Sequence, residues 1–170
     1  MARGYIYEIT DNIDAYGIHL MGADEICNSY PQEADYYTEL DETELGEAKI
    51  DLIHTMESYG FRTGKSEDKT LWTDEPIPWF EASNFGKRNY FRNRLQELQK
   101  MASDITLDQF ANIPTTGDVD RLSSVTLKNL IDNDYTNAVY FNNSFYTFDD
   151  FMRNLEPNRK YYIGTICLMH

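Results

Sequence analysis

The amino-acid sequence predicts a single α+β domain, spanning residues 1–170, with a mainly antiparallel sheet and two principal helices. Three observations lead to this prediction: strand-like runs at both ends of the chain, an apolar stripe at helical spacing behind a capping signal, and a hairpin signal near residues 138–148. The length of 170 residues suits one domain, and 41% of the residues are hydrophobic. We therefore expect one folded unit with a buried core.

The N-terminal part of the chain predicts several short elements. Residues 5–9 are aromatic or β-branched except for one glutamate, and the polar pair at residues 11–12 ends this run as a turn. Residues 17–21 are expected to form a partner strand, residues 23–28 a short helix and residues 36–40 another short strand. We expect the opening strand to pair with the C-terminal one.

The clearest helix signal begins at Asp41. Its side chain can accept a hydrogen bond from the first turn while Glu44 reaches back, which is a capping box, and Gly60 is a typical stop. A helix over residues 42–59 then presents an apolar stripe to the core, formed by Leu45, Ala48, Leu52, Met56 and Tyr59. The opposite side of this helix carries Glu44, Glu47, Asp51 and His54.

A second long helix is predicted in the middle of the chain. Residues 62–80 are expected to be irregular, because Pro76 and Pro78 forbid a helix there. A helix over residues 84–102 follows, and its predicted buried stripe consists of Phe91, Leu95, Leu98 and Ala102. The exposed side of this helix is expected to be basic.

The C-terminal third predicts strands with short helices between them. Two short helices are expected first, one capped by Thr106 and one over residues 123–131. Apolar runs on both sides of a polar turn predict a tight hairpin near residues 138–148, and Thr147 is expected to cap a following short helix. Residues 161–168 are apolar on both alternating faces, which is typical of a central strand covered on both sides.

The negative charge of the chain lies almost entirely in its N-terminal half. Residues 1–80 hold 18 acidic and 5 basic residues, a net charge of −13, whereas residues 81–170 hold 11 and 10, a net charge of −1. The whole chain carries −14. Because the charge is uneven, the two halves are expected to face different partners or each other.

The densest acidic segment surrounds the start of the first helix. We call it the acidic face, and it consists of Glu39, Asp41, Glu42, Glu44, Glu47 and Asp51. Duplex DNA carries one negative charge per about 1.7 Å of its axis, and carboxylates on rigid elements can imitate that density. We therefore expect the acidic face to bind a basic protein, with a nucleic-acid-processing enzyme as the favoured class. A solvated surface that only maintains solubility is the alternative.

Size and acidity also point to a biological class. Small acidic inhibitors encoded by phages and mobile elements, including antirestriction and anti-CRISPR proteins, are similar to this chain in length and composition. The similarity implies the role of an inhibitor and assigns no residue.

Lysine and arginine gather near the start of the second helix. We call this the basic face, and it consists of Lys87, Arg88, Arg92 and Arg94. It is expected to neutralise the acidic face, either within the chain or across a homodimer. Direct nucleic-acid binding is disfavoured, because a chain with a net charge of −14 repels a polyanion.

The sequence contains no motif that identifies a reaction. It has no Gly-x-Ser-x-Gly pattern and no phosphate-binding loop, so we expect a protein without catalytic residues or a cofactor. Glu47, Asp51 and His54 share one helix face, but metal binding needs ligands from a second element, so no metal is expected. The alternative function is a small enzyme or ligand-binding domain with an aromatic-lined pocket, for which Trp72 and Trp79 are candidates.

Cysteine usage and hydropathy indicate the compartment. Cys27 and Cys167 are too few for a disulfide framework and are expected to be reduced thiols. No signal peptide and no run of the roughly 18 apolar residues that a membrane span requires is visible. We therefore expect a cytoplasmic protein that makes no membrane contact.

Overall fold

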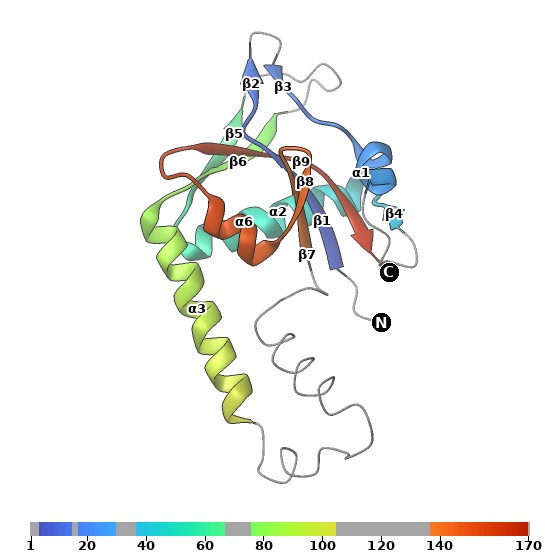
Figure 1. Cartoon of the computed structure of the whole chain (residues 1–170). Helices are drawn as coiled ribbons and strands as arrows, with labels where there is room; N and C mark the ends of the chain where they lie inside the picture. Colours follow the sequence, from blue (N-terminus) through green and yellow to red (C-terminus); the bar gives the residue numbers. More distant parts are fainter. Residues whose placement is uncertain (1–3, 15–16, 30–36, 67–75, 105–136, 170) are drawn as a thin grey trace, which may run out of the picture.

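The computed structural model describes residues 4–14, 17–29, 37–66, 76–104 and 137–169 (Figure 1). These residues form an α+β fold built on one seven-stranded sheet, as the sequence predicts. The sheet follows the order β5-β6-β9-β1-β7-β8, and β4 pairs with the C-terminal end of β9 on the edge opposite β1. Its strands are β1 (Gly4–Thr10), β4 (Tyr37–Glu39), β5 (Arg62–Ser66), β6 (Ile77–Glu81), β7 (Asn137–Phe141), β8 (Ser144–Thr147) and β9 (Lys160–Met169).

Strand pairing confirms the expected antiparallel character of the sheet. The opening strand β1 pairs antiparallel with the C-terminal strand β9, in the register Tyr5 to Leu168 and Tyr7 to Ile166. On its other side β1 pairs parallel with β7, which is the one parallel pair among the described strands. The central position of β9 explains why residues 161–168 are apolar on both faces, since helices or loops cover each side.

Three of the four described helices pack on one face of the sheet and the fourth packs on the other. The main core joins α2 (Glu42–Tyr59), α3 (Asn84–Ser103) and α6 (Phe148–Asn154) to the inward side chains of the strands. On the opposite face, α1 (Ala23–Ser29) covers a smaller cluster around Ile6 and Cys167. Alternation along β1 sends Tyr7 to the main core and Ile6 to the smaller cluster, as the two-residue period of a strand requires.

The helix predicted over residues 42–59 has the bounds Glu42–Tyr59 and the expected cap. The Glu44 amide donates to Asp41 Oδ1 at 2.9 Å, and the Asp41 amide donates to Glu44 Oε2 at 3.2 Å. Gly60 ends the helix with a φ of 91°, a conformation that glycine adopts without steric cost. The predicted apolar stripe faces the core, with Met56 fully buried.

The hairpin predicted near residues 138–148 is formed by β7 and β8. Asn142 and Asn143 occupy its turn with φ angles of 50° and 60°, as a two-residue turn of the primed type requires. The Thr147 hydroxyl then accepts a hydrogen bond from the Asp150 amide at 3.1 Å, so Thr147 caps α6 as expected.

Residues 62–80 were expected to be irregular, and this prediction is wrong at both ends. Strands β5 and β6 pair antiparallel there, with Lys65 opposite Pro78. The pairing of β6 with β9 begins only at Trp79, so Pro78 lies outside the β6–β9 ladder. Proline has no N–H to donate and is tolerated where a strand is paired on one side only. Helix-breaking residues therefore excluded a helix but not a strand.

Residues 17–21 pair differently from the prediction. Strand β3 (Gly17–Ile18) pairs with β2 (Ile13–Asp14) in a separate two-stranded ribbon, not with β1. The short helix expected at residues 23–28 and the strand expected at residues 36–40 are present as α1 and β4.

The second long helix has the predicted bounds within one residue, but its buried side is different. Leu95 is 54% exposed and Ala102 is exposed, whereas Tyr90 and Arg94 are buried. The C-terminal half of α3 extends beyond the sheet in Figure 1, so apolar residues there do not all reach a core. Spacing alone therefore predicted the helix and not its orientation.

Other sequence expectations concern thiols, membranes and further helices. The Cys167 thiol is buried and outside any disulfide. Among the described residues, no helix combines the length and the apolar character that crossing a bilayer requires. The helices predicted at Thr106 and over residues 123–131 lie outside the described residues.

Candidate functional site

The acidic face lies along the start of α2 and on the strand before it. All six of its carboxylate residues are exposed, on β4, at the helix cap and along the first three turns of α2. Asp41 and Glu44 also form the capping box, so their carboxylates bind backbone amides. Glu42, Glu47 and Asp51 make no ion pair with any residue in the described part of the chain, and their carboxylates face solvent.

Helix α1 extends the acidic face. Its first turn carries Asp24 and Glu25, and the Asp24 side chain hydrogen-bonds to the Glu39 carboxyl. This hydrogen bond, and then the negative charge of Asp24, raise the pKa of Glu39 above its ordinary value although Glu39 is exposed. The carboxyls of Asp24 and Glu39 therefore lie close together at this end of the acidic face.

Two of the four residues of the basic face, Lys87 and Arg94, make internal contacts, although the sequence predicted an exposed basic side. Arg94 is 9% exposed, and its Nε donates to Asp149 Oδ2 of α6 at 3.2 Å. The Lys87 ammonium donates to the carbonyl oxygens of Arg153 at 2.7 Å and Leu155 at 2.8 Å. These contacts hold α3 against both ends of α6, so half of the basic face has a structural role.

Only Arg88 and Arg92 of the predicted basic face point into solvent. Arg92 donates to Asn89 on its own helix at 2.8 Å. Within the described residues, no ion pair links α2 to α3, so the two faces make no direct ionic contact within the chain. Neutralisation across a homodimer stays a prediction.

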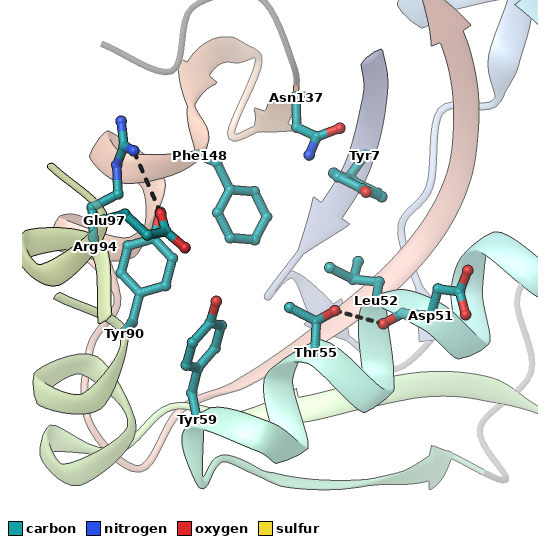
Figure 2. Close-up of a pocket in the computed structure, with 10 residues that line it drawn as sticks. All are labelled: Tyr7, Asp51, Leu52, Thr55, Tyr59, Tyr90, Arg94, Glu97, Asn137 and Phe148. Carbon is teal, nitrogen blue, oxygen red and sulfur yellow. Dashed lines mark hydrogen bonds and ion pairs between the residues drawn. The ribbon is translucent and has the colours of Figure 1, made fainter. Parts of the chain in front are cut away.

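A cavity of about 230 Å³ opens between α2 and α3 (Figure 2). Strand β1, the start of β7 and the start of α6 close its remaining sides. Sequence reasoning missed this cavity, because its residues come from five separate segments. They are Tyr7, Asp51, Leu52, Thr55, Tyr59, Tyr90, Arg94, Glu97, Asn137 and Phe148.

One wall of the cavity contains a buried polar network. The Tyr90 hydroxyl donates to Asp149 Oδ1, and Arg94 pairs with the other oxygen of the same carboxylate. Burial, and then the hydrogen bond to Asp149, raise the pKa of Tyr90 far above its ordinary value. Arg94 also contacts Glu97 at 3.6 Å, so two carboxylates neutralise one guanidinium.

Two further tyrosines line the cavity with unused hydroxyl groups. Neither Tyr7 nor Tyr59 donates a side-chain hydrogen bond to any residue in the described ranges. Burial raises the pKa of Tyr7 to about 12, with smaller contributions from Tyr5 and from the charge of Asp51. The pKa of Tyr59 is raised by burial and then by the charge of Glu97.

The tryptophans proposed for an aromatic pocket do not line this cavity. Trp79 lies in a separate cluster with Ile18, Ile77 and Tyr162, on the other face of the sheet. The Lys160 ammonium lies 4.3 Å from the centre of its ring. Trp72 is outside the described residues. The cavity between α2 and α3 is lined by tyrosines instead, and the thirteen tyrosines of the sequence were too many to single out these three.

Metal ligands are not assembled in the described part of the chain. Glu47, Asp51 and His54 are all exposed on α2, and no group of three or more His, Cys, Asp or Glu residues among the described ones is arranged to hold a metal ion.

A second hollow, near the turn of the β7–β8 hairpin, contains the buried carboxylate of Glu8. Glu8 accepts hydrogen bonds from the amides of Met21 and Thr165, the latter at 3.0 Å. A bulge in the pairing of β1 with β9 places Gly164 and Thr165 opposite Glu8. Burial raises the pKa of Glu8, and the backbone hydrogen bonds oppose this rise. Its satisfied oxygens indicate a structural tie rather than a catalytic group.

Comparison with known proteins adds no relative: no protein-family profile, curated protein or solved structure matches this chain.

Proposed function

We propose that this protein is a non-enzymatic interaction protein whose acidic face binds a basic partner. The observation that supports the proposal is the state of Glu42, Glu47 and Asp51. Their carboxylates are exposed, stand on a capped helix, and make no ion pair with the described residues. Charges left uncompensated on a rigid element favour association with an opposite charge, because such a contact needs little reordering of the chain.

The spacing of these carboxylates suits a partner that binds nucleic acid. Four acidic residues lie between Glu42 and Asp51 inclusive, so at about 1.5 Å of rise per residue they follow one another at about 4.5 Å along the axis. Phosphates of one DNA strand follow at about 3.4 Å. The similar density supports the role of a nucleic-acid mimic that inhibits a nucleic-acid-processing enzyme.

A charge-reversal experiment tests the proposal. Reversing Glu42, Glu47 and Asp51 to lysine spares the capping box, and three reversals take the net charge from −14 to −8. The matched control reverses three exposed acidic residues elsewhere and causes the same change of net charge: Asp104, Asp150 and Glu156. Tagged wild-type protein and both variants are then used to capture partners from a lysate of the source cells.

The expected result is that the control retains the partners of the wild type and the α2 variant loses them. Capture that is unchanged in the α2 variant refutes the proposal. Mimicry is tested separately, because duplex DNA added to the captured complex should release a partner that binds both at one site. A partner that DNA does not displace contradicts mimicry and leaves the interaction intact.

The second candidate function, a small enzyme or ligand-binding domain, requires a pocket, and the described residues form two hollows of about 400 Å³ each besides the cavity between α2 and α3. Pockets for drug-sized ligands usually measure about 300–1,000 Å³, and the cavity between α2 and α3 measures about 230 Å³. Its volume equals that of roughly eight water molecules at about 30 Å³ each. A cavity of that size suits one small group, such as the end of a side chain, better than a cofactor.

A further inference from the structure

The walls of the cavity between α2 and α3 form a continuous aromatic series. Tyr59 contacts Tyr90 with ring centres 5.2 Å apart, Tyr90 lies 5.9 Å from Phe148, and Phe148 lies 6.1 Å from Tyr7. In Figure 2, Tyr59 projects from α2 with its hydroxyl end directed toward Phe148. Aromatic rings attract cations through their electron-rich faces, so several rings around one small space favour a positively charged group.

The charges around the cavity favour the same kind of ligand. Asp51 and Glu97 line it, and the guanidinium of Arg94 is already paired with Asp149 at 3.2 Å and Glu97 at 3.6 Å. Two carboxylates therefore contact the guanidinium of Arg94, and Asp51 lines the cavity from α2. Among the described residues these three carboxylates outnumber the one guanidinium, so their summed charge is negative. An anion would have to displace a buried ion pair, whereas a cation meets carboxylates that are not fully neutralised.

The tyrosine hydroxyls supply an independent sign that a ligand belongs here. Tyr7 is only 8% exposed, lines the cavity, and has no hydrogen-bond partner for its hydroxyl among the described residues. A buried hydroxyl without a partner is costly. A hydroxyl oxygen can accept from an ammonium or guanidinium N–H, so a cationic ligand would satisfy both Tyr7 and Tyr59.

We infer that this cavity binds one alkylammonium or alkylguanidinium group, which is a lysine or arginine side chain of the basic partner. The identity of the donor rests on the proposed function. Glu44, Glu47 and Asp51 follow one another at spacings of three and four on α2, and the last of them lines the cavity. The acidic face thus continues to a residue that lines the cavity, and the cavity would anchor a partner that the acidic face attracts.

Small analogues test the cavity without the partner. n-Butylammonium and n-propylguanidinium reproduce the side chains of lysine and arginine, and 1-butanol is the neutral counterpart. Each is titrated into the full chain while NMR follows the aromatic and amide signals of the cavity residues. The expected result is saturable shifts with both cations and binding of 1-butanol that is weaker by about tenfold or more. Equal binding of 1-butanol, or no shifts with the cations, overturns the inference.

Substitutions separate the aromatic and charge contributions. Tyr59→Leu removes both the ring and the hydroxyl acceptor and should weaken n-butylammonium binding by roughly tenfold, whereas Tyr59→Phe removes only the hydroxyl and should weaken it by less. Asp51→Asn should weaken binding severalfold, and Glu47→Gln, one turn earlier and outside the cavity, is its matched control. Equal loss in Asp51→Asn and Glu47→Gln would indicate attraction by the surface as a whole and would overturn the inference.

The two proposals fail in distinguishable ways. If the wild type binds n-butylammonium while the α2 charge-reversal variant still captures every partner, the acidic-face function is refuted and the cation site stands. If partners are captured through the acidic face but n-butylammonium leaves the cavity signals unchanged, the cation site alone is refuted.

Discussion

The buried ion pair between Arg94 and Asp149 offers a sharp test of how the cavity wall is held together. Asp149→Asn removes one charge while keeping the size of the side chain, and Arg94→Met removes the other while keeping most of its length. Both residues are buried, at 9% exposed for Arg94 and 3% for Asp149, and the Tyr90 hydroxyl binds the same carboxylate. The double variant removes both charges together.

The burial of both residues determines how much free energy of unfolding each variant should lose. Removing one partner of a buried pair costs about 3–5 kcal/mol, because the other charge stays buried without compensation. The Glu97 carboxylate, 65% exposed and 3.6 Å from Arg94, compensates part of the loss in Asp149→Asn, so we expect about 3 kcal/mol for each single variant. The double variant leaves no isolated charge and should lose about 3 kcal/mol in total, which gives a coupling energy of about 3 kcal/mol.

The assay is urea unfolding followed by tryptophan fluorescence, with the free energy of unfolding extrapolated to water. The matched control is the exposed pair of Asp150 and Arg153 on α6, whose side chains are 53% and 54% exposed. The same cycle at this pair should give at most about 0.5 kcal/mol. Additive losses in the Arg94 and Asp149 double variant, near 6 kcal/mol, would refute the view that these charges compensate each other.

Three further predictions concern other elements of the fold. Gly164→Ala should destabilise the protein by about 1–3 kcal/mol, because an added Cβ would overlap the carboxylate of Glu8. Gly46 lies on α2, and an added Cβ there would meet no atom within 4 Å, so Gly46→Ala should stabilise the protein by about 0.5–1 kcal/mol. Urea unfolding in which both variants change the free energy of unfolding in the same direction would contradict this reasoning. The pKa of Tyr7 is about 12 in the fold against 10.0 ordinarily, so its protonated form stabilises the fold below pH 10 and this contribution is lost as the pH rises through 12. Tyr7→Phe should therefore make the alkaline fall in unfolding free energy shallower by about 1.4 kcal/mol per pH unit between pH 10 and pH 12, and an unchanged slope would contradict the buried hydroxyl. Asp41→Ala should lower the free energy of unfolding by about 1 kcal/mol, and Asp41→Asn by much less, since asparagine also caps helices. Thermal unfolding followed by circular dichroism checks this, and equal losses of stability in the two variants would contradict the role of Asp41 as a cap.

The candidate site divides between what local sequence could predict and what it could not. The six residues predicted for the acidic face are all exposed, because they lie on α2 outside its apolar stripe or before its first turn. The basic face was predicted only in part. Lys87 and Arg94 carry the same charge as Arg88 and Arg92, yet they bind groups on α6, some 55 to 68 residues away in sequence. No local pattern distinguishes a buried arginine from an exposed one when its partner is that distant.

Local signals in the sequence determined the elements of this protein: the capping box at Asp41, the hairpin turn at Asn142, the cap at Thr147 and the all-apolar strand at the C-terminus. Each of these features depends on residues a few positions apart, so the local sequence is sufficient to predict it. Tertiary structure alone decided which side of α3 is buried and how the tyrosine cavity is assembled. Those features depend on contacts among five separate segments, and only their packing on one sheet brings the aromatic rings and carboxylates together.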